Sequence, residues 1–367
     1  MWKSWWHRWV APHWRIGFLQ NTLEEVIAGA EPEIKWMRAK HQDGWFADPF
    51  VLKVTDTSIS LLAEEFRYKT GKGRIVRLDI DRETLTLETV TPLIDGCHLS
   101  FPFIISTLPT EGSEAAGSRF KVQGSKPSGL SMLPTEGGRP PVPGSRFQVQ
   151  GLPTDLHRFS QIINDSSRQA IIFNPQFSIA FGDDCHDSVN QASLLTLAAP
   201  IILNSHEVMV FPETGKEGRW GCHRLNVDTN ECVLERVMCD KPLVDAVIYE
   251  DHVFATSFPD PNGKSLGVYE LSEDGCQLER TVTFEENVAH NAGAFFKIGE
   301  KVYRPAQECN EWYGHALSIQ EYQQGTFHEV RRIPGLHTLN MFQGVTVVDQ
   351  KLFPRQWIYR LIGKSDL

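Results

Sequence analysis

The chain repeats one hairpin pattern five times. Each unit is an apolar strand, a tight polar turn and a second strand whose last apolar residues are followed by polar ones. The units read ADPFVLKVTDTSISLLAEEF (47–66), SFPFII (100–105) resumed by HEVMVFPET (206–214), VDAVIYEDHVFATSF (244–258), AGAFFKIGEKVYRPAQ (292–307) and QGVTVVDQKLFPRQ (343–356). The positions that close the second strands are separated by 149, 43, 49 and 50 residues, at Leu62, Phe211, Phe254, Tyr303 and Phe353. A period of about 40 to 50 residues is typical of stacked four-stranded blades. The pattern therefore predicts an all-β fold, a five-bladed β-propeller.

The one long interval coincides with a change in composition. Residues 107–151 hold an internal duplication rich in Gly, Pro and Ser, LPTEGSEAAGSRFKVQG (108–124) and LPTEGGRPPVPGSRFQVQG (133–151), a composition typical of flexible linkers. We interpret residues 106–205 as a partly flexible insertion in the second blade, because hairpin tips tolerate long insertions. We expect Phe103–Ile105 and Val208–Val210, on either side of it, still to pair.

These boundaries divide the chain into three parts. Residues 1–44 form a Trp-rich segment and a lead-in strand, residues 45–105 and 206–367 form the propeller, and residues 106–205 are inserted. Without the insertion about 53 residues remain for each unit, which suits a four-stranded blade.

Composition excludes several classes of protein. Hydrophobic residues make up 41% of the chain, enough to bury a core. Lys and Arg number 36 against 46 Asp and Glu, a formal net charge of −10, so we expect no nucleic-acid partner, which would need clustered cations. The sequence shows neither an apolar run of about 18 residues nor the apolar core of a signal peptide, which favours a cytoplasmic location. The seven cysteines are scattered without a C-x-x-C pair and fit reduced thiols.

The first residues form a separate motif. A helix there would carry four indoles on one face beside Lys3 and Arg8, at Trp2, Trp5, Trp6 and Trp9. Such a face suits a peripheral membrane contact. The alternative, which we favour because Pro12 ends a short stretch, is that the rings pack on the body of the protein.

In a propeller the innermost strands converge on an axis, so residues at the starts of the first strands become neighbours. That position offers a polar group in every unit: Asp48, His98 with Ser100, Asp245, His290 with Asn291, and His337 with Asn340. The position after the second strand gives Glu64 with Glu65, Glu213, Thr256, Arg304 with Gln307, and Arg355.

Carboxyl groups around one polar funnel are what glycosyl transfer requires, one protonated to assist the leaving oxygen and one ionised. The candidates are Asp48 as base or nucleophile, Glu213 as acid and Asp245 as the group that tunes the pKa. Taken singly, Asp48 fits a capped turn before Pro49 and Asp245 a strand-edge acid bonded to backbone. As a set at matching positions, they favour catalysis.

Other residues suit recognition of a sugar. Guanidinium and amide groups make directional contacts to hydroxyl or anionic oxygens. Arg304 and Gln307, with Tyr313 nearby, are therefore candidates for binding the substrate. The alternative for Arg304 is an inter-blade salt bridge. Trp45 and Trp220 could stack on a sugar ring or fill the space between blades.

Metal and cofactor chemistry have weaker support. His98, His290 and His337 could share a divalent cation with an axial Asp, but no ligand spacing supports this, and we favour neutral, hydrogen-bonded histidines. No phosphate loop, nucleophile elbow or dinucleotide motif occurs. We therefore expect no cofactor and no metal.

Several motifs, taken in order, resemble a known domain. They are WFADPF (45–50), HLSFP (98–102), FPET (211–214), RPAQ (304–307) with Tyr313-Gly314, and LHT (336–338). Together they resemble the domain that precedes the glycosyltransferase in plant glucosamine inositolphosphorylceramide transferases, which also occurs in bacterial proteins beside formyltransferase-like domains. The resemblance covers about 45–105 and 206–360; the insertion departs from the family pattern.

The resemblance implies a five-bladed architecture similar to that of glycoside hydrolase family 43. In that family an Asp of the first blade is the base, and Asp48 corresponds to it. Glu213 precedes Asp245 here, whereas the hydrolase order is Asp, Asp, Glu, so the other two roles do not transfer.

Two functions follow. The first is a carbohydrate-active protein with a glycosidase-like funnel, acting on a glycan or glycolipid sugar in surface-polysaccharide metabolism. The second is a non-catalytic module that binds a glycan or glycolipid headgroup and assists a glycosyltransferase or formyltransferase.

Overall fold

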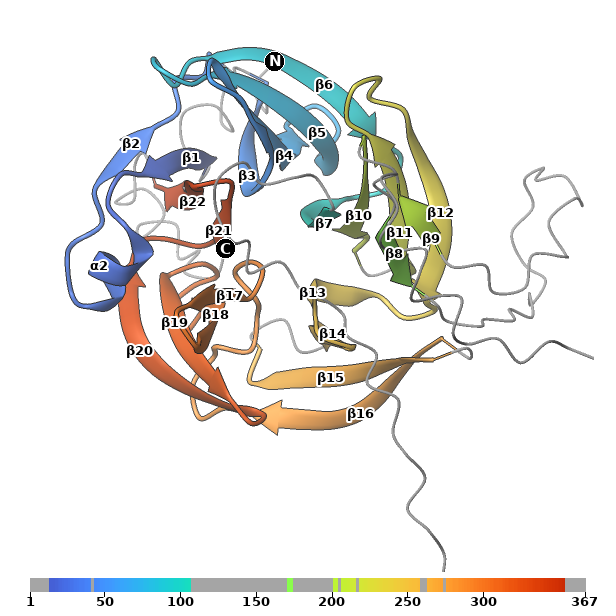
Figure 1. Ribbon diagram of the computed structural model, residues 1–367, viewed down its shortest axis with the longest axis vertical. Helices are drawn as coiled ribbons and strands as arrows, with labels where there is room; N and C mark the ends of the chain where they lie inside the picture. Colours follow the sequence, from blue (N-terminus) through green and yellow to red (C-terminus); the bar gives the residue numbers. More distant parts are fainter. Residues whose placement is uncertain are drawn as a thin grey trace, which may run out of the picture.

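The protein is a five-bladed β-propeller. The computed structural model describes residues 13–40, 43–106, 170–173, 201–203, 206–215, 218–257, 263–272 and 275–353. Five four-stranded antiparallel sheets surround one axis, each with its first strand innermost (Figure 1). The predicted fold class is confirmed.

The blades follow the chain in order. From the axis outward they are blade 1, β3 (Gly44–Val54), β4 (Ser58–Arg67), β5 (Lys72–Asp81) and β6 (Leu87–Ile94); blade 2, β7 (Ser100–Ser106), β10 (Glu207–Glu213), β11 (Trp220–Asn226) and β12 (Cys232–Cys239); blade 3, β13 (Leu243–Tyr249), β14 (His252–Ser257), β15 (Ser265–Ser272) and β16 (Gly275–Thr283); blade 4, β17 (Phe296–Ile298), β18 (Lys301–Glu308), β19 (Ala316–Gln323) and β20 (Thr326–Pro334); and blade 5, β21 (Leu339–Phe342), β22 (Val345–Leu352), β1 (His13–Leu19) and β2 (Ile34–Trp36).

Blade 5 joins both ends of the described chain. β1 pairs with β22, with Gly17 opposite Val348, and β2 pairs with β1 on the outside. The short helix α2 (Leu23–Ile27) connects β1 to β2 and starts with a capping box, in which Thr22 Oγ1 accepts a hydrogen bond from Glu25 N at 3.2 Å. The propeller thus begins before residue 45, where we had expected it, because its ring closes through a strand from the N-terminal part.

The insertion leaves blade 2 intact. Phe103, Ile104 and Ile105 of β7 pair with Phe211, Val210 and Met209 of β10, so the two halves of the interrupted hairpin meet as we expected. Within the insertion, β8 (Ala170–Phe173) and β9 (Ile201–Leu203) form a separate two-stranded sheet. The duplicated LPTEG element and the Trp-rich segment 1–12 lie outside the described residues.

The core lies between blades. Trp220, on β11, is 0% exposed and stacks on Phe211 of β10, with ring centroids 5.4 Å apart. Trp220 belongs to an apolar cluster that also contains Leu243 and Val247 of blade 3, so it fills space between blades, the second of the two roles that we considered for it. Within the described part of the chain, no helix is long and apolar enough to cross a bilayer.

Candidate functional site

Asp48 and Asp245 occupy equivalent positions in blades 1 and 3. Each lies in an irregularity of the innermost strand, between Ala47 and Phe50 or between Val244 and Val247. Each has a left-handed backbone, with φ of 50° and 48°. Such a conformation is costly for a residue other than Gly and is typical of functional sites. The same bulge occurs in both strands. It turns the two side chains away from the direction that regular alternation along the strand would give them.

In blade 2 the equivalent residue is Phe101, with φ 43°. Its N–H donates to Asp48 Oδ2 at 3.3 Å, so the carboxylate of blade 1 reaches blade 2. Ser100 pairs with Glu213 in the ladder. His98 lies beside the site: it is exposed, and its Nδ1 accepts a hydrogen bond from Gly73 N at 2.8 Å. In blade 2, the axial position that we assigned to His98 and Ser100 is therefore occupied by the apolar residue Phe101.

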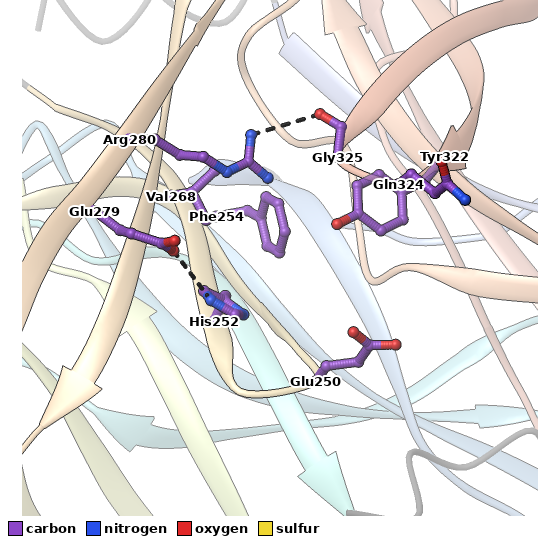
Figure 2. Close-up of a pocket in the computed structure, with 9 residues that line it drawn as sticks. All are labelled: Glu250, His252, Phe254, Val268, Glu279, Arg280, Tyr322, Gln324 and Gly325. Carbon is purple, nitrogen blue, oxygen red and sulfur yellow. Dashed lines mark hydrogen bonds and ion pairs between the residues drawn. The ribbon is translucent and has the colours of Figure 1, made fainter. Parts of the chain in front are cut away.

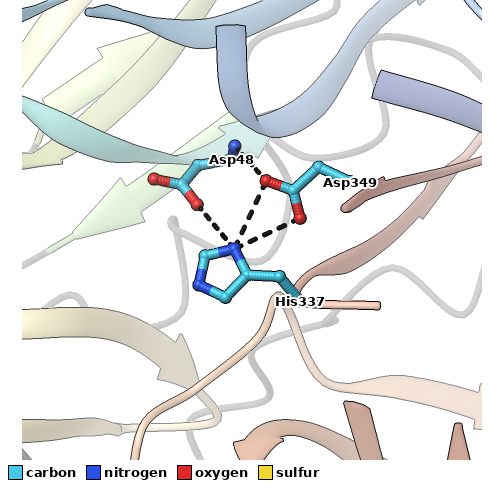
Figure 3. A group of neighbouring side chains, drawn as sticks. All are labelled: Asp48, His337 and Asp349. Carbon is cyan, nitrogen blue, oxygen red and sulfur yellow. Dashed lines mark hydrogen bonds and ion pairs between the residues drawn. The ribbon is translucent and has the colours of Figure 1, made fainter. Parts of the chain in front are cut away.

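Asp48, His337 and Asp349 form a buried cluster where blades 5 and 1 meet (Figure 3). His337 Nδ1 lies 3.2 Å from Asp349 Oδ1 and 3.5 Å from Asp48 Oδ1. The Asp349 carboxylate also accepts hydrogen bonds from Thr338 N and Oγ1, both at 2.8 Å, and from Asp48 N at 2.9 Å. Asp349, which is 0% exposed, anchors the cluster.

Burial and mutual charge set the protonation of this cluster. Burial raises the pKa of Asp48 to about 7, with further increases from Asp349 and Asp245, although His337 opposes them. Burial lowers the pKa of His337, but Asp349 and Asp48 outweigh burial and hold it above its usual value. Burial raises the pKa of Asp349, but His337, Thr338 and the Asp48 N–H outweigh this and leave it lowered. These shifts favour the ionised form of Asp349 and the protonated form of His337, and they leave Asp48 near its midpoint at neutral pH.

Sequence analysis missed Asp349. We aligned the fifth repeat on Phe353, whereas the ladder of β22 places Val348 opposite Leu339. In the corrected register, Asp349 follows an apolar pair just as Glu64 follows Leu62-Ala63. Arg355, which the first register selected, lies outside the described residues.

A second acid–imidazole pair lies in blades 3 and 4. His290 Nδ1 is 2.7 Å from Asp245 Oδ2, and Gln307 Nε2 donates to the same oxygen at 3.1 Å. Asn291 Nδ2 donates to the backbone oxygens of Asp245 at 2.7 Å and Phe254 at 2.8 Å. His290, Asn291 and Gln307, all predicted site residues, are thus bonded to one another or to Asp245.

Arg304 stands behind this pair. It is 0% exposed, and its guanidinium donates to Asn291 Oδ1 at 2.7 Å, Gln320 Oε1 at 2.8 Å and the carbonyls of Val288 and Ala289. Burial lowers its pKa to about 9, which still leaves it charged at neutral pH. The inter-blade salt bridge that we considered is not among its contacts. Arg304 instead braces the segment that carries His290 and Asn291.

Glu213 and Glu64 complete the set of acids. Glu213 Oε2 accepts a hydrogen bond from Asp245 N at 3.1 Å. Burial, followed by Asp245 and Asp48, raises the pKa of Glu213 well above its usual value. Burial, followed by Asp48 and Glu213, does the same for Glu64. Two hydrogen bonds, from Asp245 N to Glu213 and from Phe101 N to Asp48, link carboxyl groups to the neighbouring blades and so connect blades 1, 2 and 3 at the axial strands.

Aromatic rings surround the imidazoles. Tyr313 is 39% exposed, and its ring centroid lies 5.1 Å from that of His337 and 5.9 Å from that of His290. Trp14 lies 4.3 Å from the His337 ring and 6.3 Å from Trp45, which itself stacks on Phe66. We refer to Trp14, Trp45 and Tyr313 as the aromatic rim. Trp14 was missed because it lies on β1, which joins blade 5 only through ring closure, by pairing with β22.

The histidines do not form the shared metal site that we considered. His290 and His337 belong to separate acid clusters, and His98 contacts Gly73 instead. Among the described residues, Asp48, His337 and Asp349 each offer one donor atom within 4.8 Å of the others, a carboxylate and imidazole set that could hold a divalent cation. In the present arrangement hydrogen bonds already join His337 to Asp349.

Four buried polar atoms at the axis have no hydrogen-bond partner among the described residues: Asp48 Oδ1, Glu64 Oε1, Gln307 Oε1 and His337 Nε2. Buried polar groups are normally paired, with protein, water or ligand. They come from blades 1, 4 and 5, and three of them belong to predicted site residues, Asp48, Gln307 and His337. These atoms therefore offer buried hydrogen-bonding capacity to a polar ligand.

A cavity of about 510 Å³ lies between blades 3 and 4, away from the acid clusters (Figure 2). Phe254 and Val268 supply apolar lining, and Glu250, Arg280 and Tyr322 are among its polar residues. Two of its charged groups already have partners, since His252 pairs with Glu279 at 3.1 Å and Arg280 Nη1 lies 3.5 Å from Gly325 O. No predicted site residue lines this cavity.

Fold and site together define a five-bladed β-propeller with two carboxylate–imidazole clusters at its axis. No family model matches the chain. Two rice proteins named glucosamine inositolphosphorylceramide transferase 1, from Oryza sativa subsp. indica and subsp. japonica, are each 24% identical over 152 residues, which is 38% of this chain. The chain spans only 20% of the length of these relatives. The similarity shows a distant relationship to a glycosyltransferase-related protein; the likeness to glycoside hydrolase family 43 stays a prediction.

Proposed function

We propose that the protein binds a glycan or the sugar of a glycolipid at the propeller axis and acts on it. The observation that carries this proposal is the set of four buried atoms without a hydrogen-bond partner among the described residues, on Asp48, Glu64, Gln307 and His337. A sugar presents several hydroxyl groups, each both donor and acceptor, and so can satisfy such a set at once. The aromatic rim supplies the apolar faces on which a sugar ring stacks.

The protonation states suit glycosidic chemistry. Asp48, with a pKa raised to about 7, is poised to accept a proton near neutral pH. Burial and Asp245 raise the pKa of Glu213 well above the usual value, which favours its protonated form as the donor to a leaving oxygen. Asp245 N orients the Glu213 carboxyl. In hydrolysis, a water molecule would attack the anomeric carbon and lose a proton to Asp48. The departing oxygen would gain the proton of Glu213.

The substrate class comes from the relatives. Their name describes glucosamine transfer to inositolphosphorylceramide, so we propose a sugar on a phosphoinositol-type lipid, or a related surface glycan, as the ligand. Hydroxyl and amino groups of such a sugar could both bond to the axial acids.

The second candidate is a binding module that assists a separate transferase. The hydrogen bonds of Asp245 and Asp349 favour this candidate. Each carboxylate is bonded to an imidazole and to at least one further donor. Carboxylates fixed in this way suit recognition better than proton transfer.

A glycan and glycolipid array probed with the full chain, followed by product analysis of every bound compound, tests both functions. We expect the wild-type chain to bind a glycan and to release a sugar from it. Release of the sugar should be lost in Asp48→Asn and in Glu213→Gln. It should be kept in the control Asp56→Asn, which changes an exposed carboxylate at the β3–β4 turn. Binding without product in the wild-type chain would select the binding module. No binding to any glycan would contradict both.

A further inference from the structure

Cys239 and Cys276 lie on the outer strands of neighbouring blades. Cys239 ends β12 of blade 2, and Cys276 is the second residue of β16 of blade 3. Cys239 Sγ donates a weak hydrogen bond to the carbonyl oxygen of Cys276 at 3.9 Å. The fold therefore places the Cys239 thiol against Cys276 across a blade boundary, although the two residues are 37 positions apart.

The two thiols are not equivalent. The hydrogen bond from Cys276, helped by the backbone N–H and charge of Lys241, lowers the pKa of Cys239 to about 7 against the effect of burial. The same hydrogen bond, together with burial, raises the pKa of Cys276. At pH 7 about half of Cys239 is therefore thiolate, while Cys276 remains a thiol. The thiolate is the reactive form of cysteine.

The other buried thiols differ in this respect. Burial raises the pKa of Cys222, Cys232 and Cys309 to about 12, so these three remain thiols at neutral pH and are poor nucleophiles. Cys97 is exposed and provides an internal comparison for simple accessibility. Cys239 is only 3% exposed, which favours reaction with a small oxidant over exchange with a bulky disulfide.

We propose that Cys239 is a modification site for hydrogen peroxide and that Cys276 resolves it into a disulfide between blades 2 and 3. The Cys239 thiolate attacks one oxygen of the peroxide, the O–O bond breaks, and sulfenic acid and hydroxide form. Cys276 sulfur then attacks Cys239 sulfur, and the sulfenic oxygen leaves as water with the Cys276 proton. In total two thiols lose two electrons and two protons, and one peroxide becomes two waters. The bond ties the blade that carries the insertion to its neighbour.

Peptide mapping of the full chain tests this site. The reduced protein is treated with hydrogen peroxide, alkylated under denaturing, non-reducing conditions, digested and analysed by mass spectrometry. We expect a linked peptide pair that contains Cys239 and Cys276, absent in Cys239→Ser and present in the matched control Cys222→Ser. In Cys276→Ser we expect Cys239 sulfenic acid, trapped by dimedone, because the resolving thiol is gone.

The oxidised wild-type chain should also melt at a higher temperature than the reduced chain, a difference that Cys276→Ser abolishes. The proposal is overturned if Cys239 and Cys276 are both alkylated after Cys97 has been oxidised, if either is linked to another cysteine, or if the link forms only in denaturant. None of these outcomes depends on glycan binding.

Discussion

The backbone N–H of Asp48 donates to Asp349 Oδ2 at 2.9 Å, although the two residues are 301 positions apart in sequence. This bond joins the first blade to the last at the axis, and Asp349 also holds His337 and Thr338. One buried carboxylate thus contributes both to ring closure and to the orientation of two site residues.

Replacing Asp349 with Ala should destabilise the propeller. The change removes the partner of a buried imidazolium and leaves the N–H groups of Asp48 and Thr338 unpaired, a loss of about 3–5 kcal/mol by comparison with other buried ion pairs. Asp349→Asn keeps acceptor capacity and should lose less. Thermal unfolding of both variants beside Asp56→Asn measures the effect; melting temperatures equal to wild type would show that Asp349 does not hold the blades together.

Asp48 should make the protein less stable as pH rises. Its folded pKa of about 7 lies above the unfolded value of about 3.9, so the folded state binds the extra proton between these two values. Stability from this group is complete below about pH 4 and lost progressively up to about pH 7. Asp48→Asn, which resembles the protonated acid, should therefore gain stability relative to wild type across that window. A difference in melting temperature that stays constant from pH 4 to pH 8 would refute the raised pKa.

Part of this site could be predicted from sequence and part could not. Asp48 and Asp245 were found because the apolar and polar residues of their hairpins repeat in the same register. Asp349 was missed because the fifth repeat fits two registers, and the apolar Phe353 selected the wrong one. Trp14 could not be found from the repeat, because β1 joins blade 5 only as its third strand, by pairing with β22 at the opposite end of the described chain. The shift from Ser100 to Phe101 depends on a bulge, a backbone feature without a clear sequence signal.

Gly314 should be essential for the aromatic rim. Its φ is +73°, and a Cβ there would lie 2.7 Å from His337 Cδ2 and 2.8 Å from Trp14. Gly314→Ala should therefore displace Tyr313 and weaken glycan binding at least tenfold while the blades remain folded. Gly71→Ala is the matched control, because Gly71 also has a positive φ, +66°, but has nothing within 4 Å of the added carbon. Equal effects of the two changes on binding would mean that backbone strain, not the rim, is responsible.

Tyr313 should bind sugar mainly through its ring. Tyr313→Phe keeps the ring and should retain most of the affinity, whereas Tyr313→Ala should lose about 0.5–1.5 kcal/mol, up to roughly tenfold in Kd. Val233→Ala, on the exposed face of β12, controls for loss of an exposed apolar group. Titration calorimetry with the strongest array ligand measures these affinities, and an unchanged Kd in Tyr313→Ala would remove Tyr313 from the site.

The central claim is that the propeller axis binds a sugar through buried atoms that have no hydrogen-bond partner among the described residues. A crystal structure of the full chain with the strongest array ligand tests it most directly. We predict sugar hydroxyl or amino groups within hydrogen-bond distance of Asp48 Oδ1, Glu64 Oε1, Gln307 Oε1 or His337 Nε2, with a ring face on the aromatic rim. A sugar bound on another surface, with these four atoms bonded only to water, would contradict the claim.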